Sequence, residues 1–205
     1  GRIKLKHTKS FQELQKFFSE VYQWFLSLKD ISLSQFPTDK TAHIIVDMIN
    51  GFVKEGALSS KEVLSINNSV ADFAAVCTKN NIPNIALADS HSKESVEFRT
   101  FPVHCLDGTY ESEVTDEIKN SSDFTVIKKN STNGFLEPQF ADIINKTDKN
   151  TFIVTGDCTD MCVIQFALTL KADFNRRNTE SRVIVPYELT ATCSMPNHEP
   201  ELAEI

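Results

Sequence analysis

The sequence contains no apolar run close to the roughly 18 consecutive residues that a membrane-spanning helix needs. Its first residues lack the apolar core and small-residue cleavage site of a secretory signal peptide. Basic residues are a minority, with 21 Lys and Arg against 28 Asp and Glu and a formal net charge of −7, and no basic stripe occurs. These absences argue against a membrane or nucleic-acid partner, and we expect a cytoplasmic protein.

A disulfide framework is also missing, because the five cysteines are odd in number and scattered, as expected for reduced thiols. The 205 residues, 40% of them hydrophobic, are enough to form one sizeable hydrophobic core. They are too few to form two domains that each have a core of this kind. The chain shows no repeats, low-complexity tract or linker. We therefore expect one globular domain over residues 41–205, preceded by a helical extension over residues 1–40 that packs on it, and a homo-oligomer of unspecified size.

Short apolar runs alternate with helical patterns along the chain. An amphipathic helix is predicted after Ser10, a plausible N-cap. Strands are predicted at residues 43–47, 85–89, 124–127, 152–156 and 183–185, with helices around residues 66–77 and 162–170. Because parallel neighbours need crossover connections, this α/β alternation predicts a three-layer α/β/α sandwich around a mostly parallel central sheet. The chain begins without Met and stops soon after the last strand, so we expect an incomplete polypeptide.

Several of the predicted strands end in polar residues, and such ends converge at one edge of a parallel sheet. Asp47, Lys129 and the turn leading to Cys162 should meet there. A cysteine at a helix start favours thiolate, an adjacent Asp47 carboxylate can accept the thiol proton, and Lys129 can orient that carboxylate. Backbone N–H groups of Cys158 and Cys162 are candidate oxyanion donors. Each residue alone has a plainer interpretation, as a core cysteine, a cap or a solvated lysine.

A second polar group directly follows the strand at residues 85–89. Two imidazoles and two carboxylates within sixteen residues can converge on one divalent ion, and mixed nitrogen and oxygen ligands suit Zn, Fe or Mn better than Ca or Mg. The candidate ligands are Asp89, His91, Glu97 and His104. The two histidines could equally cap turns.

Three segments, taken in order, resemble the isochorismatase-like cysteine hydrolases, the superfamily that includes nicotinamidase. They are IIVDMINGF at 44–52, KNSTNGF at 129–135 and TGDCTDMCV at 155–163. The resemblance covers roughly residues 42 to 190 and implies the Rossmann-like fold of that superfamily. It also implies a catalytic triad of Asp47, Lys129 and Cys162, and a cis peptide between Asp157 and Cys158. The interval to Phe135 and strand alternation select Lys129 over Lys128.

Within that superfamily, the sequence is most similar to nicotinamidases. These carry Asp-x-His, a further His or Glu, and Pro-x-His-Cys as a metal site, and the resemblance implies one divalent transition metal, zinc first and Fe or Mn as alternatives. Phe52 and Phe101 match aromatic walls of the pyridine pocket. The usual residue at Phe101 is Trp, and this departure leaves the substrate open.

The expected activity is hydrolysis of a small planar amide through a Cys162 thioester, with nicotinamide as the preferred substrate and NAD salvage as the setting. One alternative is a metal-free hydrolase of the same superfamily that acts on an N-carbamoyl or ureido compound or an enol ether. A second alternative is a binding or interaction protein that keeps the hydrolase fold without its activity. A third is a redox role for Cys158 and Cys162.

Overall fold

The computed structural model describes residues 10–193, and the chain divides into two units, one ending at Gln35 and the other beginning at Phe36. The first unit holds helix α1 (Phe11–Leu26). Ser10 caps it, since its hydroxyl accepts from Glu13 N–H while the Glu13 carboxylate accepts from Ser10 N–H. The predicted cap is confirmed, whereas the packing of this helix on the domain stays a prediction.

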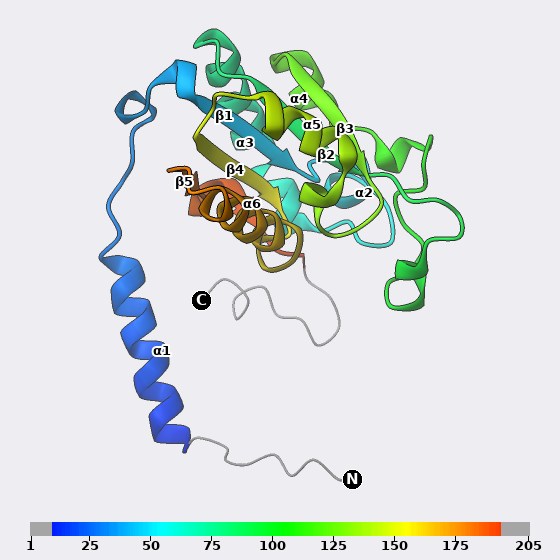
Figure 1. Ribbon diagram of the computed structural model, residues 1–205. Coiled ribbons are helices and arrows are strands. Elements are labelled where there is room, and N and C mark those ends of the chain that lie inside the picture. The colour runs from blue at the N-terminus through cyan, green and yellow to red at the C-terminus, as the bar shows by residue number, and fades with distance from the viewer. Residues whose placement is uncertain (1–9, 194–205) are drawn as a thin grey trace. The chain divides into compact units, whose positions relative to one another are not determined.

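The second unit is built on a parallel sheet (Figure 1). Its strands are β1 (Thr41–Val46), β2 (Asn84–Asp89), β3 (Phe124–Lys129), β4 (Thr151–Asp157), β5 (Arg182–Ile184) and β6 (Thr190–Ala191). The strand order is β3-β2-β1-β4-β5, and the short β6 pairs with the end of β4. All named pairings are parallel, which confirms the predicted fold class. The sequence pattern did not predict β6.

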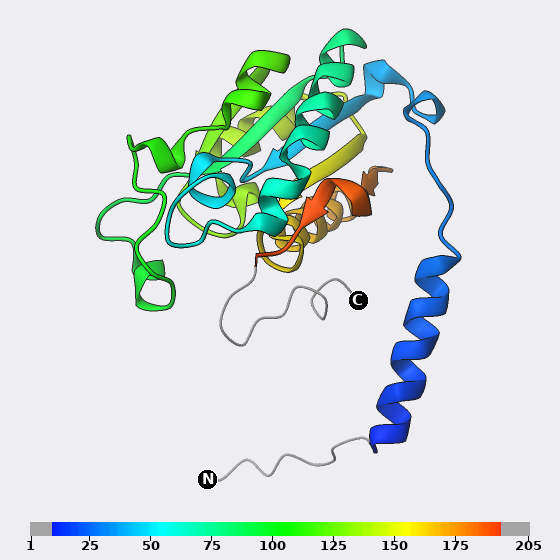
Figure 2. The ribbon, with the colours of Figure 1, turned by 180° about the vertical axis from the view of Figure 1, so that it is seen from behind.

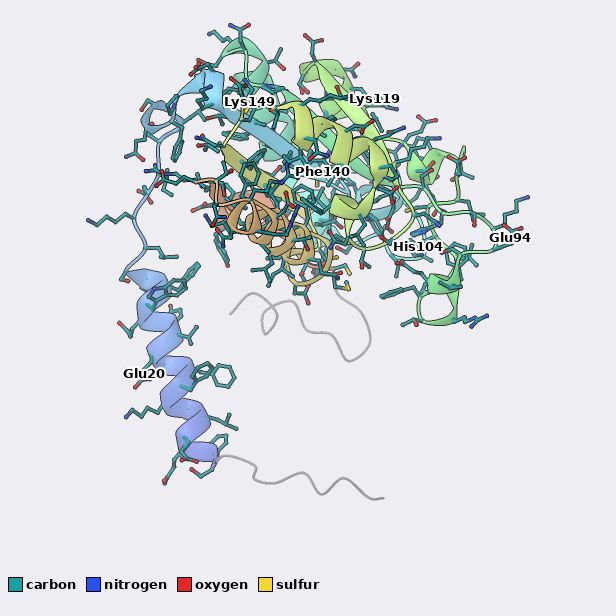
Figure 3. All side chains as sticks on the ribbon, viewed as in Figure 1. Glu20, Glu94, His104, Lys119, Phe140 and Lys149 are labelled. Atoms are coloured by element: carbon teal, nitrogen blue, oxygen red, sulfur yellow. The ribbon has the colours of Figure 1, made fainter. Side chains whose placement is uncertain are left out.

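Helices cover both faces of this sheet (Figures 1 and 2). Alternating strand residues create the two cores: Ile45 and Ala86 face one layer, and Ile44 and Leu87 face the other. The first layer contains α2 (Asn50–Val53), α3 (Lys61–Lys79) and α4 (Asp116–Ser121). The second contains α5 (Pro138–Lys146), whose Phe140 is fully buried (Figure 3), and α6 (Ile164–Arg176). Within residues 10–193, no helix is long and apolar enough to cross a membrane.

His43 is a fully buried polar residue in the central strand β1. Its Nδ1 lies 2.7 Å from Asn84 Oδ1, and its Nε2 lies 2.8 Å from Thr155 Oγ1. The Asn84 amide donates through Nδ2 to the carbonyls of Ala74 and Asp123, which leaves its oxygen to accept from the His43 Nδ1–H. Burial lowers the pKa of His43 to about 4, and the Asn84 hydrogen bond opposes this only in part.

We therefore expect acid destabilisation through His43. Its pKa is lower in the folded chain than in the unfolded chain, so the unfolded state binds more protons as the pH falls from 6.5 to 4, and stability is lost across that window. This residue alone should cost about 2 kcal/mol between pH 6.5 and pH 5. Chemical denaturation of the wild type and His43→Gln at both pH values measures the difference, and an equal loss in the two proteins would contradict the assignment.

Gly156 allows β1 and β4 to approach closely beside the carboxyl ends of the strands. Its φ is +109°, and a Cβ there would lie 1.9 Å from the Val46 carbonyl oxygen. Gly108 has a φ of +74° with no atom within 4 Å of such a Cβ. We expect Gly156→Ala to cost about 3 kcal/mol or more. Gly108→Ala should cost only the backbone strain of about 1–2 kcal/mol. Equal losses by chemical denaturation would show that the close approach is unimportant.

Candidate active site

Four strand ends gather polar side chains at one edge of the sheet. Asp47 directly follows β1, Asp89 ends β2, Lys129 ends β3, and Cys162 lies in the turn after β4. Because β3, β2, β1 and β4 are consecutive neighbours, these ends lie side by side. All four side chains are buried, and Lys129 is among the largest fully buried side chains in the described chain.

The ammonium group of Lys129 is the centre of this cluster. Its Nζ lies 2.8 Å from Asp47 Oδ2, forms a close ion pair with Asp89 Oδ1, and lies 3.8 Å from Cys162 Sγ. It also donates to the carbonyl of Ser131 at 3.2 Å. The remaining Asp47 oxygen accepts from Asp89 N–H at 2.9 Å. The structure thus brings Asp47, Lys129 and Cys162 together, as the sequence predicts.

Lys128, the alternative to Lys129, has a different environment. Its side chain is 65% exposed, and its ammonium pairs with the exposed Asp107 carboxylate at 2.5 Å. Neighbouring residues of a strand point to opposite faces, so burying Lys129 directs Lys128 away from the site. The predicted register of this strand is confirmed.

Burial controls the protonation of the site. It raises the pKa of the Cys162 thiol well above its usual range, and the nearby Lys129 charge lowers that pKa only in part. Burial, followed by the Asp89 charge, raises the pKa of Asp47 to about 7, against the opposing effect of Lys129. Cys162 lies in a π-helical turn that leads into α6, as a helix-start position requires, but its burial opposes the expected lowering of the thiol pKa.

The turn that carries Cys162 has an unusual backbone. The peptide between Asp157 and Cys158 is cis, which confirms the feature that the resemblance implies. The N–H groups of Met161 and Val163 both donate to the Cys158 carbonyl at 3.1 Å. The Cys158 thiol lies 3.3 Å from Cys193 Sγ. Its sulfur partner is thus Cys193, a residue that the sequence pattern did not single out, and the structure does not pair it with Cys162 as the redox alternative requires.

Three of the four candidate metal ligands form a close group: one ligand atom each from Asp89, His91 and His104 lies within 4.8 Å of the others. His91 Nε2 is 3.3 Å and His104 Nε2 is 3.8 Å from Asp89 Oδ2. Ligands bound tetrahedrally to zinc at about 2.0–2.1 Å are roughly 3.3 Å apart, so these separations suit one shared ion.

Hydrogen bonds orient both imidazoles of this group. His104 Nδ1 lies 2.8 Å from the Pro102 carbonyl, to which it must donate. His91 Nδ1 lies 3.2 Å from Asn130 Oδ1, an oxygen that also accepts from Ser92 N–H. Both Nε2 lone pairs are then free to ligate, and His91 Nε2 is buried without a hydrogen bond among the described residues. The donor set and its orientation fit a divalent transition metal.

Glu97 lies beside this group rather than within it. Its Oε2 is 3.9 Å from His91 Nε2, while its Oε1 accepts from Thr132 N–H at 3.1 Å. Ligation by Glu97 stays a prediction.

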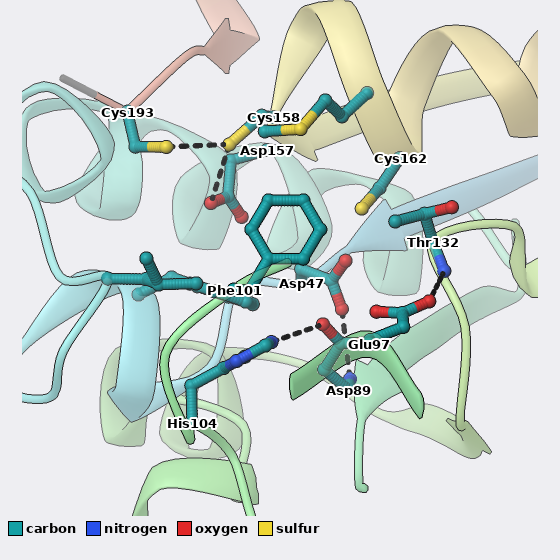
Figure 4. Close-up of a pocket in the computed structure, with 13 residues that line it drawn as sticks. Asp47, Asp89, Glu97, Phe101, His104, Thr132, Asp157, Cys158, Cys162 and Cys193 are labelled. Carbon is teal, nitrogen blue, oxygen red and sulfur yellow. Dashed lines mark hydrogen bonds and ion pairs between the residues drawn. The ribbon is translucent and has the colours of Figure 1, made fainter. Parts of the chain in front are cut away.

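A pocket connects the two clusters (Figure 4). Phe52 and Phe101, the two predicted aromatic walls, both line it. The lining also includes five residues that had not been predicted to line the pocket: Leu58, Thr132, Asp157, Met161 and Cys193. Of these, Asp157 alone had a signal available, since it ends a buried strand at the reactive edge.

The fold is a three-layer sandwich in which an aspartate, a lysine and a cysteine on a turn lie beside a group of candidate metal ligands. This combination is typical of the isochorismatase-like hydrolases. The Isochorismatase domain model matches residues 41–205, and the chain belongs to this family.

Individual relatives are amidases. The chain is 30% identical over 173 residues to nicotinamidase 1 of Arabidopsis thaliana, covering 76% of this chain and 70% of that protein. Its fold is similar to N-carbamoylsarcosine amidase from Thermoplasma acidophilum, with TM-score 0.64, 29% identity, and 77% and 87% of the two chains covered. It is also similar to the Pyrococcus horikoshii pyrazinamidase in complex with zinc, with TM-score 0.66, 23% identity, and 80% and 90% covered.

Proposed function

We propose that this protein hydrolyses a small planar amide, with nicotinamide as the preferred substrate and nicotinate and ammonia as products. The observation that carries the proposal is the meeting of two clusters in one pocket: Asp47, Lys129 and Cys162 on one side, and Asp89 with His104 on another. The similarity to nicotinamidase 1 of Arabidopsis thaliana supports the amide class.

The triad residues divide the chemistry between them. The Cys162 sulfur attacks the amide carbon while its proton passes to Asp47, since burial raises the pKa of the thiol and Asp47 is a carboxyl group in the same cluster with a pKa of about 7. The C–N bond breaks as Asp47 returns that proton to the departing ammonia. Water then attacks the thioester with Asp47 as base, which restores the thiol. Lys129 holds Asp47 in place by their 2.8 Å contact.

The negative charge that develops on the substrate oxygen needs hydrogen-bond donors. We assign this role to the backbone N–H groups of Cys158 and Cys162. The assignment is supported by the position of both residues, which line the pocket on the turn that follows β4.

Asp89, His91 and His104 would hold a divalent ion, with Glu97, whose Oε2 lies 3.9 Å from His91 Nε2, as an additional ligand. The Pyrococcus horikoshii relative was solved in complex with zinc, and we propose zinc for this chain as well. When bound, the ion would hold the substrate's ring nitrogen and orient the carboxamide.

The second candidate is an N-carbamoyl or ureido substrate, favoured by the similarity to N-carbamoylsarcosine amidase. The charge of the pocket argues against it. Four carboxyl side chains line the pocket, namely Asp47, Asp89, Glu97 and Asp157, and its lining among the described residues includes no Arg or Lys. Lys129, just behind the lining, already pairs with two carboxylates. A substrate carboxylate would lack a protein cation, so the pocket suits a neutral amide better.

Ammonia release from purified protein tests the proposal. Nicotinamide, pyrazinamide and N-carbamoylsarcosine should be compared at equal concentration, with the Cys162→Ala variant as the blank for each. We expect release from the two ring amides. Release confined to N-carbamoylsarcosine would select the second candidate, and a metal-independent reaction would support that choice.

Metal removal should affect the ring amides selectively. Nicotinamide offers a ring nitrogen to the ion and benzamide does not, so chelation should lower activity on nicotinamide by roughly 10–100-fold more than activity on benzamide. The His91→Ala variant should reproduce this selectivity, because it removes one of three ligands. Elemental analysis of protein purified without chelator should find about one transition-metal ion per chain. Full nicotinamide hydrolysis by metal-free protein would contradict the assignment.

A further inference from the structure

Asp157 is a buried carboxyl group that the proposed reaction does not use. It is the last residue of β4, its side chain has no solvent exposure, and it lines the same pocket as Asp47 and Cys162. Figure 4 shows its carboxyl group beside Cys158, at the opposite end of the drawn pocket from Asp89 and His104, with the Phe101 ring between them. The pocket therefore has two polar ends.

The hydrogen-bonding capacity of Asp157 is not used by the rest of the described chain. Its Oδ1 has no hydrogen-bond partner there. Its Oδ2 has only the Cys158 thiol, a weak donor, at 3.8 Å, and that thiol also lies 3.3 Å from Cys193 Sγ. A buried polar atom without a partner is costly, and one that lines a cavity is explained by a ligand that completes its hydrogen bonds.

The charge of the surroundings decides what Asp157 can offer. Burial, reinforced by the Asp47 charge, raises the pKa of Asp157 well above its usual range, which favours the protonated carboxyl. A neutral carboxyl presents one O–H donor and one carbonyl acceptor. Both functions suit an uncharged polar group, such as a hydroxyl, an amine or a second ring nitrogen.

We propose that Asp157 is a specificity-determining residue, which hydrogen-bonds a polar substituent on the ring of the substrate at the end of the pocket away from Asp89 and His104. The inference rests on the proposed amide hydrolysis and refines its substrate class to aromatic amides that carry a second polar group. An apolar substituent at the same place would leave the Asp157 carboxyl unpaired, and discrimination by hydrogen bonding is stronger than discrimination by shape alone.

Paired substrates and paired variants test this role. Ring-hydroxylated and ring-methylated nicotinamides have nearly the same shape, so the ratio of their kcat/KM values reports the hydrogen bond. We expect the wild type to favour the hydroxyl compound about tenfold at the ring position that faces Asp157. Asp157→Leu should abolish or reverse that ratio. Asp157→Asn, which keeps a donor and an acceptor, should preserve it. The dissociation constants of the same compounds for Cys162→Ala should show the same ratio without turnover.

The outcomes separate this inference from the proposed function. A wild-type ratio near one at every ring position, or a ratio unchanged in Asp157→Leu, would overturn the role of Asp157 while leaving nicotinamide hydrolysis in place. A structural role, with water completing the hydrogen bonds, predicts such an unchanged ratio. Failure of the wild type to release ammonia from any ring amide would instead remove the proposed function, and this inference with it.

Discussion

Replacing Cys162 with alanine is expected to lower the turnover of nicotinamide at least roughly 10⁴-fold, because the variant has no atom that can form the thioester. Cys158→Ala should cost no more than about tenfold, since the proposed contribution of Cys158 is its backbone N–H, which alanine keeps. The two thiols line one pocket and are both buried, so they form a matched pair. Steady-state ammonia release from both variants measures the difference.

A second measurement identifies the intermediate directly. Wild-type protein quenched in acid during turnover should carry a nicotinoyl group on the peptide that contains Cys162, detectable by mass spectrometry, and Cys158→Ala should carry it too. The structure places Cys158 against Cys193, so a redox reaction would involve that pair. If Cys158→Ala were as inactive as Cys162→Ala, and activity followed the oxidation state of the thiols, the acyl-enzyme mechanism would be wrong.

The central sheet could be predicted because parallel strands leave a simple pattern in a sequence. The run that ends at Asp47 is apolar and β-branched because β1 is buried on both faces, and the run that ends at Asp89 is apolar for the same reason. The polar residue that ends each run then marks the reactive edge. Lys129 was chosen over Lys128 from strand alternation and from the interval to Phe135, which matches the spacing of the resembled family. Its side chain is buried, and its catalytic role stays a prediction.

Short or irregular elements left no such pattern. Strand β6 has two residues and depends on its pairing with the end of β4. Helix α5 was also missed, although Pro138 at its start and the spacing of Phe140 and Ile144 are helix signals. The π-helical turn at Thr159–Val163 has no periodicity of its own, and its position moves Cys162 out of the first turn of α6.

The protonation of the site also could not be predicted from local sequence. A helix start favours a thiolate at Cys162, whereas the pKa of the thiol also depends on its burial, on Lys129 and on carboxylates that β1 and β2 bring to the site. The same limit applies to Asp157, whose pKa is raised by burial and by the Asp47 charge. These pKa values depend on charges that come together only in the folded chain, so no single sequence segment reveals them.

Asp47→Asn is expected to lower turnover roughly 10⁴-fold with the fold retained, because an amide cannot accept the Cys162 proton. Asp89 N–H must still donate to the side-chain oxygen, so the new amide nitrogen would face Lys129 Nζ in place of the 2.8 Å ion pair. We expect this contact to cost about 1–3 kcal/mol of stability, which chemical denaturation measures. A loss of activity with an unfolded variant would therefore not count as support.

The adjacent lysines give the matched control for this triad. Lys129→Ala removes the one cation that pairs with both Asp47 and Asp89 in the described site, and it should reduce turnover to a similar extent. Lys128→Ala removes an exposed ammonium that pairs with Asp107, and turnover should change less than about threefold. Ammonia release should be compared at a temperature where all the variants remain folded by circular dichroism. If Lys128→Ala proved the damaging change, the assignment of Lys129 to the triad would be wrong. If Asp47→Asn kept near wild-type turnover while folded, the thiol proton would have to pass to another group.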